Sequence, residues 1–428
     1  MSTEQKGFAT QQIHAGYNPK DHNDSIQVPI YQTTAFDLRT PERADKITSF
    51  QEVAFLYTRV GNPTNGVLEQ RIAALDGAVA AVSLASGQAA VSYAILNAGE
   101  GGRVIAAKQI YGGTYEGYQS LFPYLGVQID LVNDVNNLDE YRALIKPDTR
   151  AIYIETVSNP ITAIADIEKI AALAHENGLP LIVDNTLATP YLFNPIKHGA
   201  DIVVYSATKA LSGHGAIIGG LILESGKFNY GAGKHPQFQR ISHTLGNRSV
   251  AEAFPAFPFT ARIRTLYLAQ LGASLSPFNA YQILQGVETL NLRVQRQSDS
   301  ALKIAQWLEQ HPKVRKVNYA KLASSPFKAL ADKYLPKGIG GLLSFEFNGT
   351  QEEIYKFINA KEIFSYHANL GDARSLIINS PKNTHRELPE SEQLIAGITP
   401  ETIRLSIGLE DADDLINDLK QAFEKALL

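Results

Sequence analysis

The sequence contains no cysteine, and its single methionine is the first residue. Disulfide bonds, thiolate metal sites and cysteine nucleophiles are therefore excluded. No run approaches the roughly 18 apolar residues of a membrane span, and the net charge of −4 comes without a long basic run. These absences argue against a membrane protein and a nucleic-acid-binding protein. Because no apolar signal segment opens the chain, we expect a cytoplasmic protein.

The 428 residues, 44% of them hydrophobic, allow two or three lobes with sizeable cores. Residues 1–62 are polar and read as an extended N-terminal arm. Residues 63–265 alternate strand and helix patterns, which predicts an α/β domain with a mostly parallel sheet. Residues 266–428 form a second, smaller α+β domain, in which a helical period over residues 284–308 has Arg293 and Arg296 on its polar side.

Residues 224–259 interrupt the first domain with a long segment that lacks clear periodicity. The segment is rich in glycine, phenylalanine, histidine and proline. A structureless stretch of this length is usually functional or disordered. We expect a flap over the mouth of an active site; a surface excursion or an oligomer contact remain open alternatives.

Chemistry-bearing side chains follow two buried strand patterns. The apolar run at residues 202–205 ends in Ser206, Thr208 and Lys209, and the run at residues 179–183 ends in Asp184. Ligands of α/β proteins bind beyond such strand ends. A lysine there can form a Schiff base with a carbonyl cofactor, while hydroxyls bind a phosphate. A solvated lysine after a strand is the plain alternative.

Asp184 lies 25 residues before Lys209, a spacing that suits a strand, a crossover helix and a return strand. Pyridoxal phosphate needs both a lysine and an anion opposite its ring nitrogen, which keeps the ring protonated as an electron sink. The two residues meet both needs. The sequence here resembles the fold-type I pyridoxal-phosphate enzymes, and more narrowly the cysteine/methionine metabolism family of cystathionine synthases and lyases, methionine γ-lyase and acylhomoserine sulfhydrylases.

The resemblance covers roughly residues 10–425. It implies a large cofactor domain with a mostly parallel sheet, a smaller C-terminal α+β domain and pyridoxal 5'-phosphate as the cofactor. It also implies a homotetramer built of dimers with shared active sites. Tyr57 and Arg59, which otherwise read as an ordinary exposed turn, would reach across the dimer to the phosphate of the neighbour's cofactor, a role that suits an arginine fork.

A further phosphate contact is predicted where Ser86-Gly87-Gln88 opens a helix that runs through Ala98. Ser86 is a suitable N-cap, and the free amides of a helix start bind anions. A plain capped helix would look the same. The resemblance adds this turn to Ser206 and Thr208 as the phosphate site, and Gly87 would let the backbone approach the ligand closely.

Four more residues acquire roles from the resemblance. Tyr111 would stack on the cofactor ring, with its hydroxyl near the leaving group of the substrate. Asn159 would bond the ring oxygen and the substrate carboxylate, which Arg404 and the loop of Ser375 would also contact. Arg404 stands out physically as well, because a guanidinium in an apolar strand needs an anion. That anion is either a structural carboxylate or the carboxylate of an amino acid.

Within the family, the chain most resembles the sulfhydrylases that use acetylhomoserine. The insert at 224–259 and the stretch Thr384-His-Arg-Glu-Leu are typical of that branch, and Gly112 stands where methionine γ-lyases carry a cysteine. The implied reaction of methionine and cysteine biosynthesis replaces the acetate of O-acetyl-L-homoserine by sulfide to give L-homocysteine. Lys209 would be the base, assisted by Tyr111 and Tyr57, and no metal is expected. Cystathionine γ-synthase, O-succinylhomoserine sulfhydrylase, methionine γ-lyase and a non-catalytic cofactor-binding protein remain alternatives.

Overall fold

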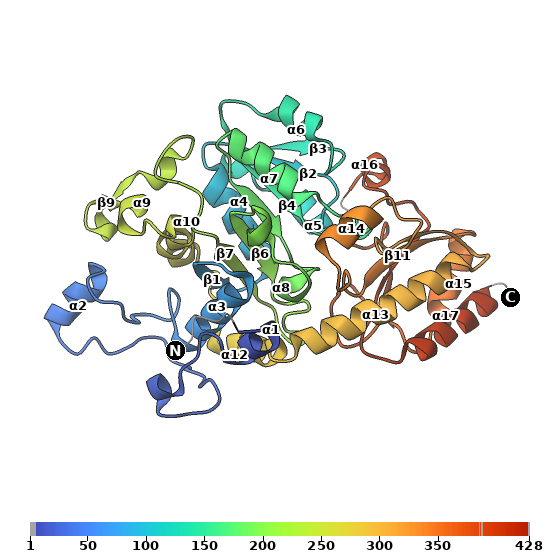
Figure 1. The fold of residues 1–428 in the computed structure, drawn as a ribbon, viewed down its shortest axis with the longest axis horizontal. Coiled ribbons are helices and arrows are strands. Elements are labelled where there is room, and N and C mark those ends of the chain that lie inside the picture. Colours follow the sequence, from blue (N-terminus) through green and yellow to red (C-terminus); the bar gives the residue numbers. More distant parts are fainter. Residues whose placement is uncertain (1–5, 385, 387, 427–428) are drawn as a thin grey trace.

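The computed structural model describes residues 6–384, 386 and 388–426, which form two lobes, each built on one sheet (Figure 1). The larger lobe holds a seven-stranded sheet in the order β1-β7-β6-β5-β4-β2-β3. Its strands are β1 (Ala80–Leu84), β2 (Gly102–Ala107), β3 (Val127–Val132), β4 (Thr149–Glu155), β5 (Leu181–Asp184), β6 (Ile202–Ser206) and β7 (Gly220–Glu224).

Strands β3, β2, β4, β5 and β6 are parallel neighbours, and only β7 runs antiparallel, between β6 and β1. The predicted α/β class with a mostly parallel sheet is therefore confirmed. The carboxyl ends of the parallel strands meet at one edge of the sheet, the edge at which α/β proteins bind ligands.

Helices flank the large sheet, and α4 packs across six of its seven strands. Two helix starts match the sequence signals, because Asn62 caps α3 ahead of Pro63 and Ser86 caps α4. The α-helices of this lobe and of the N-terminal arm are α1 (Phe8–His14), α2 (Pro41–Thr48), α3 (Pro63–Asp76), α4 (Gly87–Gly99), α5 (Gly112–Ser120), α6 (Leu138–Leu144), α7 (Ile167–Glu176), α8 (Thr189–Leu192), α9 (Val250–Ala253), α10 (Pro258–Arg262), α11 (Ala269–Leu271) and α12 (Pro277–Val287). Residues Ile263–Leu268 form a π-helix between α10 and α11.

The smaller lobe is built on a five-stranded sheet in the order β10-β11-β14-β13-β12. Its strands are β10 (Val314–Asn318), β11 (Leu342–Phe347), β12 (Ser365–Tyr366), β13 (Leu376–Asn379) and β14 (Thr402–Ser406). Its helices are α13 (Leu290–Glu309), α14 (Lys328–Tyr334), α15 (Gln351–Ala360), α16 (Glu390–Ile395) and α17 (Ala412–Ala426). Helix α13 extends from the large lobe into the small one (Figure 1). Helix α12 follows residue 266 and packs on α3 of the large lobe. The predicted boundary between the two domains at residue 266 stays a prediction. In the described part of the chain, no helix is long and apolar enough to span a membrane.

The expectation that Arg293 lies on a polar helix face is wrong. Arg293 is buried, and its guanidinium donates to the backbone carbonyls of Ala210 at 2.9 Å and Leu211 at 3.5 Å. Burial lowers its pKa to about 10. Backbone carbonyl groups of the turn after Lys209 thus accept the hydrogen bonds of Arg293. The helical spacing in the sequence had placed this arginine on the solvent-facing side of the helix.

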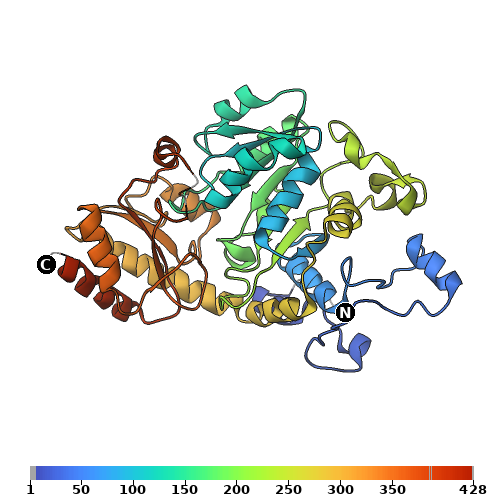
Figure 2. The same cartoon turned by 180° about the vertical axis from the view of Figure 1, so that it is seen from behind.

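The N-terminal arm and the insert at residues 224–259 project from the same side of the large lobe (Figures 1 and 2). Their contact includes Phe50 and Phe254, whose ring centroids lie 5.3 Å apart. Short elements organise the insert. They are a 3-10 turn at Pro236–Phe238, the hairpin of β8 (Ile241–Ser242) and β9 (Arg248–Ser249) around a second 3-10 turn at His243–Leu245, and helix α9.

The predicted flap over this chain's own active site is not what the structure shows. Gln237 donates to the carbonyls of Asn97 and Ala98 near the end of α4, and His235 bonds the carbonyl of Arg150 at 2.7 Å. Arg150 lies near the amino end of β4, so the insert is fixed at the edge of the sheet opposite the strand ends that carry Asp184. The open alternatives are a surface excursion or an oligomer contact.

Asp76, at the end of α3, gives the fold a pH dependence. It is fully buried, Tyr205 donates a hydrogen bond to its Oδ2 at 2.5 Å, and burial raises its pKa from 3.8 to about 7. The folded chain thus holds this proton more tightly than the unfolded chain, so stability falls as pH rises from about 4 towards 7, by about 1.36 kcal/mol per unit.

Asp76→Asn should make the free energy of unfolding less steeply dependent on pH between 5 and 7, because the amide binds no proton. Urea unfolding of both proteins at several pH values measures the slope. Asp139→Asn, at an exposed position on α6, should leave the slope unchanged. An Asp76→Asn slope equal to the wild-type slope would contradict the shifted titration.

Candidate active site

A cavity of about 680 Å³ lies at the carboxyl ends of the parallel strands, between the two lobes. Ten of the residues predicted from the sequence line it. They are Ser86, Gly87, Gln88, Tyr111, Asn159, Asp184, Ser206, Thr208, Lys209 and Arg404. The lining contains no sulfur-bearing side chain. Its size is typical of small-molecule sites, and residues scattered over more than 300 positions of the chain converge on it.

Lys209 sits in the turn after β6, and its ammonium donates to Oδ1 of Asn369 at 2.7 Å. Burial and the neighbouring positive charge of Arg404 lower the pKa of this lysine from 10.5 to about 8, partly opposed by Asp372. A substantial share of the amine is therefore neutral near physiological pH, as a nucleophile or base requires.

Asp184 ends β5 next to Glu155, which ends β4; the two Cα atoms are paired in register. Oδ1 of Asp184 accepts from the Thr186 amide at 2.9 Å, and Oδ2 accepts from the Tyr153 hydroxyl at 3.3 Å. Burial raises the pKa of both carboxyl groups, and the charge of Asp184 raises that of Glu155 further. In the part of the chain that the structure describes, no cation pairs with Asp184, so this end of the cavity is suited to a cationic ring nitrogen.

A cradle for a phosphate forms where the start of α4 meets the end of β6. Oγ of Ser86 accepts the Ala89 amide at 3.0 Å, leaving the first amides of the helix unbonded by this cap. A Cβ atom added to Gly87 would lie 2.4 Å from Cβ of Ser206, so only glycine allows this approach. Thr208 holds the turn through Gly219, whose amide donates to its Oγ1 at 3.1 Å.

Tyr111 and Asn159 come from the loops after β2 and β4. Tyr111 stands at the N-cap position of α5 without a side-chain capping bond, and the residue is 45% exposed. Its ring lies against Gly113, where an added Cβ would come within 2.6 Å of Cε1. Asn159 precedes a cis peptide bond to Pro160 and accepts a hydrogen bond from Arg404 on its Oδ1 at 3.3 Å.

Arg404 is buried in β14 and extends into the cavity from the small lobe. Its Nη2 donates to the carbonyl of Asn369 at 2.9 Å. Its printed partners among the described residues are the neutral oxygens of Asn159 and Asn369, with no carboxylate at ion-pair distance, and burial lowers its pKa to about 10. Of the two predicted partners, a structural carboxylate is thus not present among these residues, and the amino-acid carboxylate stays a prediction.

The structure does not bring Ser375, Tyr57 and Arg59 into the cavity lining. The amide and hydroxyl of Ser375 both donate to Glu410 at 2.8 Å, so this serine supports the loop instead of facing a substrate. Tyr57 and Arg59 lie exposed on the arm, with the guanidinium 5.0 Å from the ring centroid. Their predicted role in a neighbouring site stays a prediction.

Two residues of the site were missed in the sequence. Glu155 ends an apolar strand as Asp184 does, so the same strand-end signal was available for it. Asn369 lies in an irregular loop, and no local pattern shows that it bonds both Lys209 and Arg404. Thr384 of the sulfhydrylase-like stretch lines the cavity, whereas His385 and Glu387 are outside the described residues.

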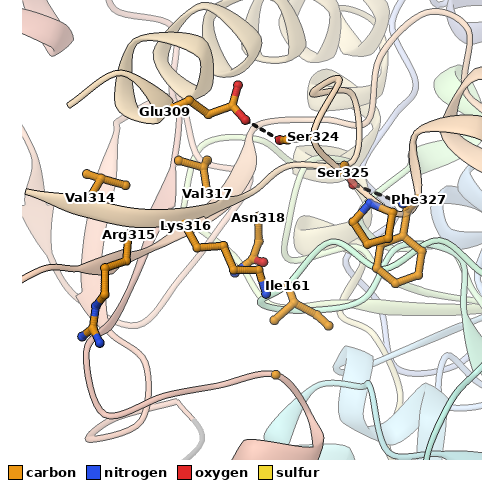
Figure 3. A pocket seen from close by; sticks show the side chains of 12 residues that line it. Ile161, Glu309, Val314, Arg315, Lys316, Val317, Asn318, Ser324, Ser325 and Phe327 are labelled. Atoms are coloured by element: carbon orange, nitrogen blue, oxygen red, sulfur yellow. Dashed lines mark hydrogen bonds between the residues drawn. The ribbon is translucent and has the colours of Figure 1, made fainter. Parts of the chain in front are cut away.

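A second cavity, of about 270 Å³, lies along the edge strand β10 (Figure 3). Polar side chains in its lining bond to other residues of the protein, as the hydroxyl of Ser324 does to Glu309 (Figure 3). None of the residues predicted from the sequence lines it. In the described ranges there is also no cluster of histidine and carboxylate side chains that could hold a metal ion.

The donor set fits pyridoxal phosphate: a lysine of lowered pKa, a carboxylate for the ring nitrogen, and a helix start that only glycine allows to lie so close to Ser206. Together with the sheet topology, this site defines a pyridoxal-phosphate-dependent enzyme of fold type I. The chain belongs to the family of Cys/Met metabolism PLP-dependent enzymes, whose family model matches residues 9–424.

Named relatives align along nearly the whole chain. O-acetyl-L-homoserine sulfhydrylase of Leptospira meyeri is 44% identical, covering 96% of this chain and 95% of its own. Homocysteine/cysteine synthase of Saccharomyces cerevisiae is 40% identical, with 97% of each chain covered. The crystal structure of a putative O-acetylhomoserine (thiol)-lyase from Campylobacter jejuni is 40% identical, covers 98% of this chain and all of its own, and superposes with a TM-score of 0.94. That structure carries a pyridoxyl-lysine phosphate.

Proposed function

We propose that this enzyme replaces the acetate of O-acetyl-L-homoserine by sulfide, giving L-homocysteine and acetate. The observation that carries the proposal is the double contact of Asn369, which accepts from Lys209 through its side chain and from Arg404 through its backbone carbonyl. The amine and the guanidinium are thus separated by the span of one residue. An amino acid whose carboxylate binds Arg404 has its Cα within reach of Lys209. The names of the relatives at about 40% identity support the choice of substrates.

The residues of the site then have separable tasks. Pyridoxal phosphate, when bound, supplies an electron sink for charge that develops on the amino acid. Lys209 takes the proton from Cα as a neutral amine. A second proton leaves Cβ, acetate departs from Cγ with the electron pair of the C–O bond, and hydrosulfide forms the C–S bond at that carbon. One proton then returns to Cβ and, from Lys209, one returns to Cα, so that acetate and L-homocysteine are the only products. Tyr111, which lines the cavity, assists the leaving group.

Other residues of the cavity bind the cofactor and the substrate. Asp184 would hold the ring nitrogen of the cofactor. The helix start at Gly87 and Gln88, with the hydroxyls of Ser206 and Thr208, would hold the phosphate. Arg404 and Asn159 hold the substrate carboxylate through a fork that suits a carboxylate. The lining of the cavity and the contacts described above support these assignments.

We also propose a cytoplasmic homotetramer of dimers in which Tyr57 and Arg59 of the partner subunit complete the phosphate site. Both residues lie on an arm outside the cavity of their own chain. The arm exposes several large apolar side chains, including Phe50, Phe55 and Leu56, which a second copy would cover.

Arg59→Ala and Lys209→Ala chains, each inactive alone, should recover part of the wild-type activity after subunit exchange. A mixed dimer carries one site with both residues intact, so recovery should reach about a quarter of the wild-type rate for equal, random mixing. Exchange is confirmed by mass-tagged subunits. Proven exchange without recovery would contradict a shared site, and light scattering of the wild type measures the tetramer.

The reaction itself is tested by product analysis. Wild-type enzyme with O-acetyl-L-homoserine and sulfide should yield homocysteine and acetate. O-succinyl-L-homoserine with sulfide, O-acetyl-L-homoserine with cysteine, and methionine alone should each react much more slowly. A faster reaction with one of these would assign the enzyme to a succinylhomoserine sulfhydrylase, a cystathionine γ-synthase or a methionine γ-lyase, respectively. A bound cofactor whose spectrum no substrate changes would indicate a non-catalytic protein.

A further inference from the structure

Glu155 is a buried carboxylic acid in the cavity wall that has no part in the reaction as proposed. Its Oε1 accepts the backbone amide of Tyr111 at 2.8 Å. The backbone amide of Asn159 bonds the same carboxyl group. One side chain at the end of β4 therefore joins two loops, the one after β2 and the one after β4.

We propose that Glu155 is a positioning residue of this active site: it fixes the backbones of Tyr111 and Asn159 so that their side chains keep their places against cofactor and substrate. The inference rests on the proposed function, which assigns those contacts. Tyr111 needs such a tie because it starts α5 without a side-chain cap and is half exposed. Glu155 also supports the proposed binding site of the substrate carboxylate, because Oδ1 of Asn159 lies 3.3 Å from Nη1 of Arg404.

The acceptor oxygen of Glu155 decides which variant preserves the contact. Burial and the adjacent charge of Asp184 raise the pKa of Glu155 well above its ordinary value. The contact with Tyr111 needs an acceptor oxygen, because Oε1 accepts the backbone amide at 2.8 Å. Glutamine has the same shape and the same acceptor oxygen, so Glu155→Gln should keep the tie, whereas Glu155→Ala removes it.

The test compares Glu155→Gln, Glu155→Ala and the wild type as holoenzymes. Glu155→Ala should lower kcat/KM for O-acetyl-L-homoserine about 100-fold with the cofactor retained, and Glu155→Gln less than about tenfold. Hydrogen exchange should become at least about tenfold faster in Glu155→Ala only in peptides that contain Tyr111 or Asn159. Glu155→Leu, which fills the volume without an acceptor, replaces Glu155→Ala if the latter does not fold, and should behave in the same way.

Glu224→Ala is the matched control. Glu224 is also buried at a strand end and accepts two backbone amides, from Thr260 at 2.8 Å and Phe259 at 3.1 Å. It pairs with Ile202 at the amino end of β6, at the edge of the sheet away from the cavity. Its loss should lower stability without changing kcat/KM by more than about threefold.

A purely structural role for Glu155 would give a different result. Glu155→Ala would then match Glu224→Ala in kcat/KM of the folded fraction, or would leave exchange at Tyr111 and Asn159 unchanged, and either outcome overturns the proposal. The exchange measurement needs no turnover. It therefore judges Glu155 independently of whether the wild type converts O-acetyl-L-homoserine.

Discussion

Lys209→Ala is expected to abolish turnover and the visible absorption of lysine-linked cofactor. The substitution removes both the covalent attachment point and the base at Cα, and a positioned base alone contributes about 10²–10⁴-fold. We therefore expect kcat to fall by at least about 10⁴-fold. Absorption spectra and steady-state rates of the purified variant provide the measurement. Borohydride-trapped cofactor on a different lysine of the wild type would contradict the assignment.

Two controls separate the base from the fold. Small primary amines added to Lys209→Ala should restore part of the rate, because they supply the missing base. With the apoprotein of the wild type, attachment of cofactor should accelerate as pH rises and level off above about 8, since the lowered pKa of Lys209 sets the fraction of neutral amine. A rate that keeps rising to pH 10 would indicate an ordinary lysine.

Arg404→Ala should lower kcat/KM by roughly tenfold to several thousandfold with nearly unchanged cofactor content. A charge-assisted hydrogen bond contributes about 1.5–3 kcal/mol, one or two of them are lost, and each 1.36 kcal/mol is about tenfold. Most of the defect should remain in Arg404→Lys, which keeps the charge but not the fork. Steady-state kinetics over a range of O-acetyl-L-homoserine concentrations provides the measurement.

Arg296→Ala is the control for this prediction, because that arginine lies on the exposed side of α13 and pairs with Asp411. It should leave kcat/KM unchanged. If Arg404→Ala instead lost its cofactor or unfolded, while the remaining enzyme kept a normal KM, Arg404 would be a structural cation. The neutral oxygens of Asn159 and Asn369 that surround it would then be its final partners.

Strand ends were the most reliable guide that the sequence offered. Lys209 and Asp184 follow apolar runs, and parallel strands bring such ends together, so their meeting in one cavity was predictable from pattern and spacing. The start of α4 was predictable for a similar reason, because a capping serine followed by glycine has a local signature. The α/β class follows from the same alternation of strands and helices.

Contacts made across the chain were not predictable in this way. Ser375 lies six residues from Asn369, yet Asn369 faces Lys209 while Ser375 is taken up by Glu410. Which residue of an irregular loop points into a cavity depends on packing that no periodicity encodes. The prediction for Arg293 was wrong for a related reason. Backbone carbonyl groups accept its hydrogen bonds, and no pattern in the sequence indicates such partners. The sequence of residues 224–259 does not indicate which edge of the sheet the insert covers.

The absence of sulfur from the cavity wall has a chemical consequence for the proposed use of sulfide. Polysulfides, the oxidised forms of sulfide, exchange with protein thiols through their S–S bonds, and exposed thiolates are the groups that oxidants modify first. With no cysteine anywhere in the chain, the nucleophile delivered to this site meets no competing sulfur atom. The protein can form neither a persulfide nor a mixed disulfide, so its working state is independent of the thiol redox balance around it.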